Sequence, residues 1–132
     1  MTNKIVNLET ISSLIPKSQS VVLCHGVFDL LHVGHIKHLK KAKSLGDKLV
    51  VTITADNFVN KGPGKPIFNQ RLRAEALSAL EMVDFVAVNE SLTAIEPIKL
   101  IKPKIYCKGI DYKNSKDDIT GEITNEQKEL KR

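Results

Sequence analysis

One stretch constrains the fold of this chain more than any other: a turn rich in glycine and histidine joins an apolar run to a helical run. The apolar run, 21–23, has the composition of a buried strand, and the helical run, 36–43, contains no helix breaker. The turn between them contains Gly26, Gly34, His25, His32 and His35. In an open parallel sheet such a turn lies at the carboxyl edge of the strands, where ligands bind. The free N–H groups at the start of the following helix favour a phosphate there.

The rest of the chain alternates between helical and strand patterns. Helices are expected over 4–15, 33–45, 69–82 and 93–102, and strands over 21–24, 48–54, 85–88 and 104–107. Gly46 is expected to cap the second helix, and Leu72, Ala76, Leu77 and Leu80 to form the buried face of the third. This order predicts an α/β fold: an open, Rossmann-like parallel sheet with helices on both faces and right-handed crossovers. Residues 113–132 are almost entirely polar, so a final strand and helix are not expected.

Composition limits the classes of function. At 132 residues the chain is expected to form a single domain, cytoplasmic, without a signal peptide or a membrane span. The net charge of +5 suggests nucleic acid, but aromatic residues are only 5% and there is no Trp. A small polyanion such as a nucleoside triphosphate is preferred as the partner. Cys24 and Cys107 are expected to be reduced, and no cluster of protein ligands for a metal is evident.

Two later segments are expected at the same edge of the sheet as the histidine turn. The loop 60–66 has two glycines, two prolines and two lysines, Lys61 and Lys65, and cannot be regular structure. The last predicted strand leads directly into Lys108-Gly109-Ile110-Asp111-Tyr112. Both segments bring basic side chains toward the predicted phosphate turn.

These motifs, taken together, resemble the cytidylyltransferase-like nucleotidyltransferases. The resemblance covers about 21–112 and rests on Gly26-Val27-Phe28-Asp29 followed by His32-Val33-Gly34-His35, on the loop 61–66, on Arg73 with the segment 79–84, and on 108–112. The superfamily includes glycerol-3-phosphate cytidylyltransferase and heptose-1-phosphate adenylyltransferase. The basic loop and the 108–112 segment are more similar to the heptose type.

The resemblance implies roles for individual residues. His32 and His35 would act on the reacting phosphate, with Lys61 and Arg73 also placed among the catalytic residues. Arg73 is preferred to Arg71 because it lies eleven positions before Asp84, the spacing of the family's phosphate-contacting arginine. The residues implied in nucleotide or phosphate binding are Gly26, Val27, Phe28, Gly34, Lys65, Lys108 and Gly109. Asp29 and Asp111 would orient acceptor hydroxyls or a magnesium ion, and Asp56 and Asp84 also occupy acidic positions of the family.

The implied reaction is transfer of NMP from CTP or ATP to a phosphorylated sugar or polyol, with release of pyrophosphate and with Mg²⁺ as cofactor. The product would be an activated precursor for surface polysaccharide, and the enzyme a homodimer. Members of the family usually carry a further Ser/Thr-rich motif after one more strand, which this sequence does not show. The chain is therefore expected to be the front of a longer protein, with a sugar kinase behind it. The alternative is a module that binds nucleotide without turnover.

Several of these residues also have simpler interpretations. His25 fits a hydrogen-bonding residue at a strand end, and His38 a surface position one helical turn after His35. Asp84 could cap the start of a strand. Cys24 and Cys107 fit buried thiols without chemical consequence.

Overall fold

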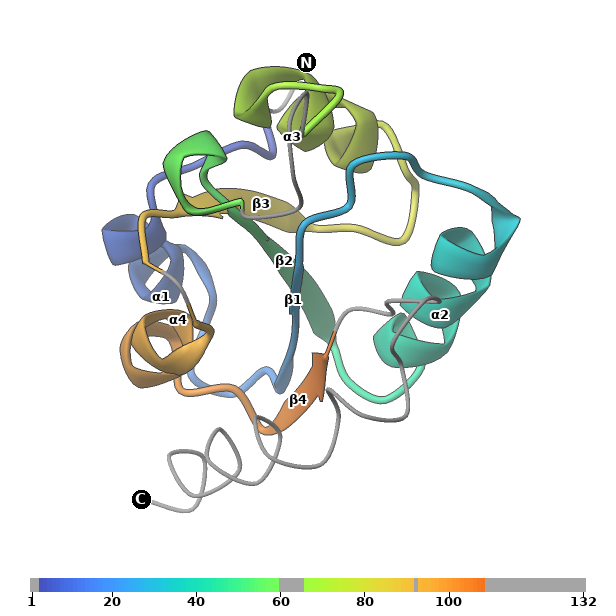
Figure 1. Ribbon diagram of the computed structural model, residues 1–132. Coiled ribbons are helices and arrows are strands. Elements are labelled where there is room, and N and C mark those ends of the chain that lie inside the picture. Colours follow the sequence, from blue (N-terminus) through green and yellow to red (C-terminus); the bar gives the residue numbers. More distant parts are fainter. Residues whose placement is uncertain (1–2, 60–65, 92, 109–132) are drawn as a thin grey trace.

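The protein forms a four-stranded parallel sheet in the computed structural model shown in Figure 1, which describes residues 3–59, 66–91 and 93–108. The strand order is β3-β2-β1-β4. The strands are β1 (Val21–Gly26), β2 (Lys48–Thr54), β3 (Phe85–Asn89) and β4 (Ile105–Lys108). The helices are α1 (Ile11–Leu14), α2 (Val33–Lys43), α3 (Gln70–Ser78) and α4 (Ile95–Ile101), with short 3₁₀ turns η1 (Leu8–Thr10) and η2 (Asp56–Phe58). The predicted α/β fold is confirmed.

Helices cover both faces of the sheet, as predicted (Figure 1). On one face α2 and α3 pack against the sheet, and on the other face η1, α1 and α4 do so. Alternate strand residues point to opposite faces, so Val51 belongs to the first core and Val50 to the second. Both residues are fully buried in β2, as expected for a central parallel strand.

The N-terminal segment is not the single helix predicted over 4–15. Lys4 to Val6 instead runs alongside the edge strand β3: Val6 N–H donates to Val86 O, and Val86 N–H donates to Lys4 O, both at 2.9 Å. Ile5 forms the parallel bridge with Val86. An edge strand leaves backbone groups unpaired, and pairing them outweighs the weak preference of a short segment for helix.

Two further details of the helices differ from the prediction. The C-cap of α2 is Ser44, and Gly46 lies beyond it, where a Cβ atom would approach Val22 Cγ2 to 2.8 Å. Gly46 is thus needed for close packing, not for the helix cap. In α3 the buried residues are Arg73, Ala74 and Leu77, whereas Leu72 is 47% exposed. Of the predicted face, Leu77 is fully buried and Leu80 packs against the core, as expected, whereas Ala76 is exposed like Leu72. Arg73 and Ala74 point inward in place of Leu72 and Ala76.

The described helices are all too short or too polar to cross a lipid bilayer.

Candidate active site

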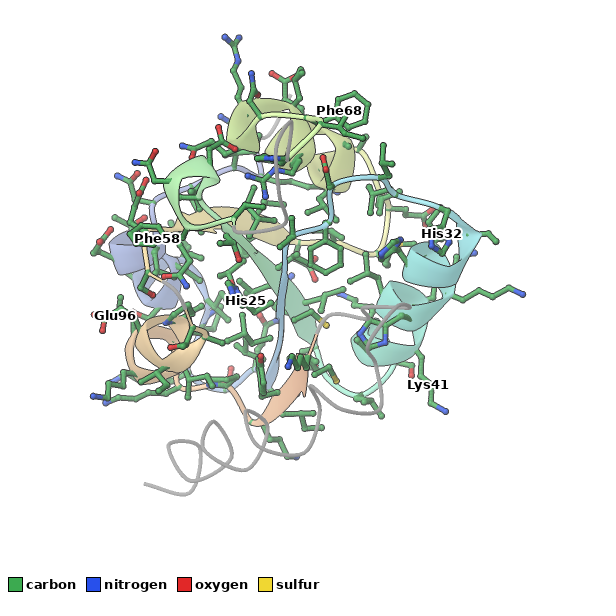
Figure 2. The ribbon with its side chains drawn as sticks, in the orientation of Figure 1. His25, His32, Lys41, Phe58, Phe68 and Glu96 are labelled. Carbon is green, nitrogen blue, oxygen red and sulfur yellow. The ribbon has the colours of Figure 1, made fainter. Side chains whose placement is uncertain are left out.

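His32 and His35 together cap the start of α2. His32 is the N-cap residue, and its Nδ1 accepts the backbone N–H of Gly34 at 3.0 Å. His35 Nδ1 accepts the backbone N–H of His32 at 3.3 Å, and the two ring centroids are 4.3 Å apart. The two imidazoles thus satisfy N–H groups at the helix start that would otherwise lack partners. Figure 2 shows His32 at this end of α2, with Lys41 toward the other end.

This reciprocal capping selects the tautomer of both rings. Because each Nδ1 accepts a hydrogen bond, a neutral ring must carry its proton on Nε2. Burial, then the neighbouring charges of His32 and His38, lowers the pKa of His35 from its usual 6.5. This lowering favours the neutral ring of His35, whose proton is on Nε2. Two imidazole donors at the positive end of a helix form a site suited to a phosphate group.

Phe28 holds the turn between β1 and α2 in an unusual backbone conformation. Its φ angle is +52°, in the left-handed region that costs about 1–3 kcal/mol for a residue other than glycine. Its ring is buried and meets the His35 ring edge-on, with centroids 5.8 Å apart. The strained backbone thus places an aromatic ring against His35, in addition to the phosphate contact predicted for the Phe28 N–H.

Arg73 is held inside the fold by three protein partners, and the phosphate contact that the resemblance implied for it stays a prediction. Its side chain is 0% exposed. Nη2 pairs with Asp56 Oδ1 at 2.6 Å, Nη1 donates to Val27 O at 2.9 Å, and Nε donates to Phe68 O at 3.0 Å. Arg73 therefore joins the β1 turn, the segment after β2 and the approach to α3. Arg71, the competing candidate, is 85% exposed and pairs with Glu75 at 3.3 Å.

Asp29 fastens a second segment to the same turn. Its Oδ2 accepts the backbone N–H of Ile67 at 2.7 Å, and its Oδ1 accepts that of Phe68 at 2.8 Å. The Asp29 carboxylate thus accepts two backbone donors, and the role toward the acceptor or magnesium that the resemblance implied stays a prediction. These hydrogen bonds, like those of Arg73, join residues far apart in sequence. No local sequence pattern predicts such partners.

The structure places the other predicted nucleotide-binding residues at the carboxyl edge of β1 and β4. Gly26 and Val27 end β1 and begin the turn, Gly34 lies in the first turn of α2, and Lys108 pairs in register with His25. Lys61, Lys65, Gly109 and Asp111 lie outside the described residues.

Three residues with competing interpretations are also placed. His25 Nδ1 lies 2.8 Å from Thr52 Oγ1, confirming a hydrogen-bonding residue at the end of β1, on the side of the sheet facing α4 (Figure 2). Asp84 accepts from Leu49 N–H at 2.8 Å and Lys43 Nζ at 2.6 Å, at the opposite edge of the sheet, confirming the capping interpretation. His38 is half-buried, and its Nε2 atom is buried without a hydrogen-bond partner among the described residues, so the surface assignment is wrong.

Comparison with known proteins points to the same family as the sequence motifs. The family model for cytidylyltransferase-like proteins matches residues 23–130. The bifunctional protein HldE of Aliarcobacter butzleri is 45% identical over 115 residues, covering 86% of this chain and 24% of that protein. HldE of Helicobacter pylori (strain P12) is 43% identical over 125 residues, covering 93% of this chain and 27% of that protein. The chain thus spans about a quarter of the length of these curated relatives.

A solved structure shows the same fold. The lipopolysaccharide core biosynthesis protein of Thermoplasma volcanium superposes with a TM-score of 0.66 and is 33% identical in sequence. The match covers 81% of this chain and 88% of that structure.

Proposed function

The chain belongs to the cytidylyltransferase-like family of nucleotidyltransferases, and we propose that it transfers a nucleotidyl group from ATP or CTP to a phosphorylated sugar. The observation that carries this proposal is the pair His32 and His35 at the start of α2. Both rings are oriented by their Nδ1 hydrogen bonds, which leaves Nε2–H as the donor of each neutral ring.

In the proposed reaction a phosphate oxygen of the sugar attacks the α-phosphorus of the triphosphate in line. A new P–O bond forms, the bond to the bridging oxygen breaks, and pyrophosphate leaves. The protein contributes mainly positioning and stabilisation of charge on the phosphoryl oxygens. The Nε2–H groups of His32 and His35 would donate to the α-phosphate oxygens, together with the N-terminal dipole of α2. Lys61, Lys65 and Lys108 would balance the charge of the remaining phosphates, as the family resemblance implies.

The proposed acceptor is a heptose phosphate or a similar sugar phosphate. Two observations support it: the basic loop 61–66 with the segment 108–112 is similar to the heptose-type enzymes, and a solved relative is a lipopolysaccharide core biosynthesis protein. A polyol phosphate such as glycerol phosphate is the runner-up. The product would be an activated precursor for surface polysaccharide.

Magnesium is proposed as the cofactor, but the described residues do not form a site for it. Among residues 3–59, 66–91 and 93–108, no three His, Cys, Asp or Glu side chains are grouped as metal ligands. The Asp56 and Asp29 carboxylates already accept hydrogen bonds from Arg73 and from the backbone. We propose that Mg²⁺ arrives bound to the triphosphate, where it supplies charge to the phosphates, and no step depends on its position.

Two proposals concern the assembly. The long relatives are named bifunctional, which is consistent with a sugar kinase unit accompanying the nucleotidyltransferase unit. The family resemblance implies a homodimer, which light scattering in solution would test directly.

The test of the proposed function is release of pyrophosphate by the purified protein, with ATP and CTP each combined with heptose, hexose and glycerol phosphates. We expect turnover with one triphosphate and a sugar phosphate. Turnover lost in His35→Ala but kept in Lys41→Ala, at an exposed position farther along the same helix, would tie it to the proposed site. Triphosphate binding by calorimetry without release of pyrophosphate from any pair would favour the alternative, a nucleotide-binding module. Oligonucleotide binding that weakens steeply with salt would instead indicate a nucleic-acid partner.

A further inference from the structure

Two cysteines lie directly opposite each other on neighbouring strands. In the register of β1 with β4, Cys24 pairs with Cys107, and both side chains belong to the core beneath α2 and α3. Neighbouring strands are about 4.8 Å apart. Disulfide-bonded cysteines have Cα atoms about 4.4–6.8 Å apart, so the backbone spacing of this pair falls within the range of a disulfide. Both are free thiols in the structure.

The two thiols have unequal environments. Cys24 is 0% exposed, and Cys107 is only partly buried. The hydrogen bond between the two side chains lowers the pKa of Cys107 to about 7, and the same bond, with burial, raises the pKa of Cys24. The more accessible sulfur is therefore the better source of thiolate, which is the reactive form of cysteine.

We propose that Cys24 and Cys107 form a two-cysteine oxidation site, which a hydroperoxide converts into a disulfide joining β1 to β4. The Cys107 thiolate attacks one peroxide oxygen; an S–O bond forms, the O–O bond breaks, and with hydrogen peroxide the leaving hydroxide becomes water. Cys24 then attacks the resulting sulfenic acid; an S–S bond forms, the S–O bond breaks, and the hydroxide takes the Cys24 proton as a second water. Two thiols are oxidised and one peroxide is reduced.

The position of this pair connects oxidation to the candidate active site. Cys24 lies two residues before Gly26, where the phosphate turn begins, and Cys107 directly precedes Lys108. A disulfide here would hold together the carboxyl ends of β1 and β4, which carry Gly26 and Lys108. The oxidation site itself does not depend on the proposed nucleotidyl transfer, because it rests only on the strand register and the thiol environments.

The test is oxidation of the folded protein with a modest excess of hydrogen peroxide, followed by intact mass spectrometry and peptide mapping without reduction. We expect a loss of about 2 Da, disappearance of both thiols, a cross-linked peptide containing Cys24 and Cys107, and full reversal by dithiothreitol. A gain of about 32–48 Da with no cross-linked peptide would overturn the proposal, and so would cross-linking only between two molecules.

Two variants assign the separate roles of the sulfurs. In Cys24→Ala, Cys107 should still be oxidised but should stop at the sulfenic acid, which dimedone traps. In Cys107→Ala, Cys24 should resist the same dose of peroxide because it is fully buried. Trapping at Cys24 instead of Cys107 would contradict the proposed order. The mapping of the unaltered protein decides the proposal even where a variant folds poorly.

Discussion

Arg73 and Asp56 form an ion pair of 2.6 Å in which the arginine side chain is completely buried, whereas the aspartate side chain is 36% exposed. The same guanidinium donates to the carbonyl oxygens of Val27 and Phe68. One side chain therefore joins three segments that surround the candidate site, and its position explains how the turn after β1 is held.

Replacing Arg73 is expected to destabilise the fold strongly. Arg73→Leu leaves Asp56, which is partly exposed, without its partner and two carbonyl groups without donors, which should lower the free energy of unfolding by about 2–4 kcal/mol. Urea unfolding measures this loss. Arg71→Ala is the matched control on the same helix, and its exposed pair with Glu75 should contribute less than about 1 kcal/mol. An Arg73 variant of normal stability but without activity would contradict the structural role and favour the predicted direct contact with phosphate.

Asp29→Asn should loosen the attachment of Ile67 and Phe68 to the phosphate turn. An asparagine has one acceptor oxygen, so one of the two exposed backbone N–H groups loses its partner, at a cost of about 0.5–1.5 kcal/mol. Hydrogen exchange at the Ile67 and Phe68 amides should quicken, and KM for the triphosphate or sugar phosphate should rise. Asp47→Asn is the control, because Asp47 also accepts a backbone N–H, from Ser20, but at the opposite edge of the sheet. Equal changes in KM for the two variants would contradict a local role for Asp29.

The contrast between Asp29 and the two histidines shows what could be predicted from the sequence. The roles of His32 and His35 depend on four consecutive positions at a helix start, so local spacing was sufficient to place them together. The partners of Asp29 and Arg73 come from distant segments brought together only by the fold. The buried face of α3 was predicted only in part for the same reason: Leu77 is buried as expected, but Arg73 is turned inward by long-range partners. The N-terminal helix failed because pairing of Ile5 with Val86 is likewise non-local.

Phe28 offers a test of the strained turn. Phe28→Ala and Phe28→Gly both remove the buried ring, but only glycine adopts a φ of +52° without steric cost. The glycine variant is therefore expected to be more stable than the alanine variant by about 1 kcal/mol, although both are less stable than the native protein. Thermal or urea unfolding of the pair measures the difference. A glycine variant less stable than the alanine variant would show that the left-handed conformation is not retained in solution.

Stability should fall on acidification, because the pKa of His35 is lowered in the folded state. Burial lowers it from 6.5, so the unfolded chain binds more protons between the folded pKa and 6.5. The stabilisation is complete above pH 6.5 and is lost as the pH falls below that value toward the folded pKa. Protonated His35 also cannot accept the His32 N–H through Nδ1.

Urea unfolding between pH 5 and 8 should show this slope, and His35→Asn should flatten it. Burial lowers the His38 pKa in the same direction. His38→Gln is therefore the comparison variant, because it shows how much of the pH dependence of stability comes from His38. An unchanged slope in His35→Asn would assign the acid sensitivity elsewhere.

His32 and His35 should act as one unit in catalysis. Both rings accept backbone N–H groups of the same helix cap, and their centroids are 4.3 Å apart. His32→Ala and His35→Ala are each expected to lower kcat by about 10²–10³-fold, the usual effect of losing one donor to a transition-state oxyanion. The double variant should lose far less than the product of the two effects, because residues of one constellation are not additive. Circular dichroism and unfolding would verify that the variants fold, and Lys41→Ala should retain full kcat. Strictly multiplicative losses in the double variant would mean that the two imidazoles act independently, and a loss confined to KM would mean that they bind the ground state alone.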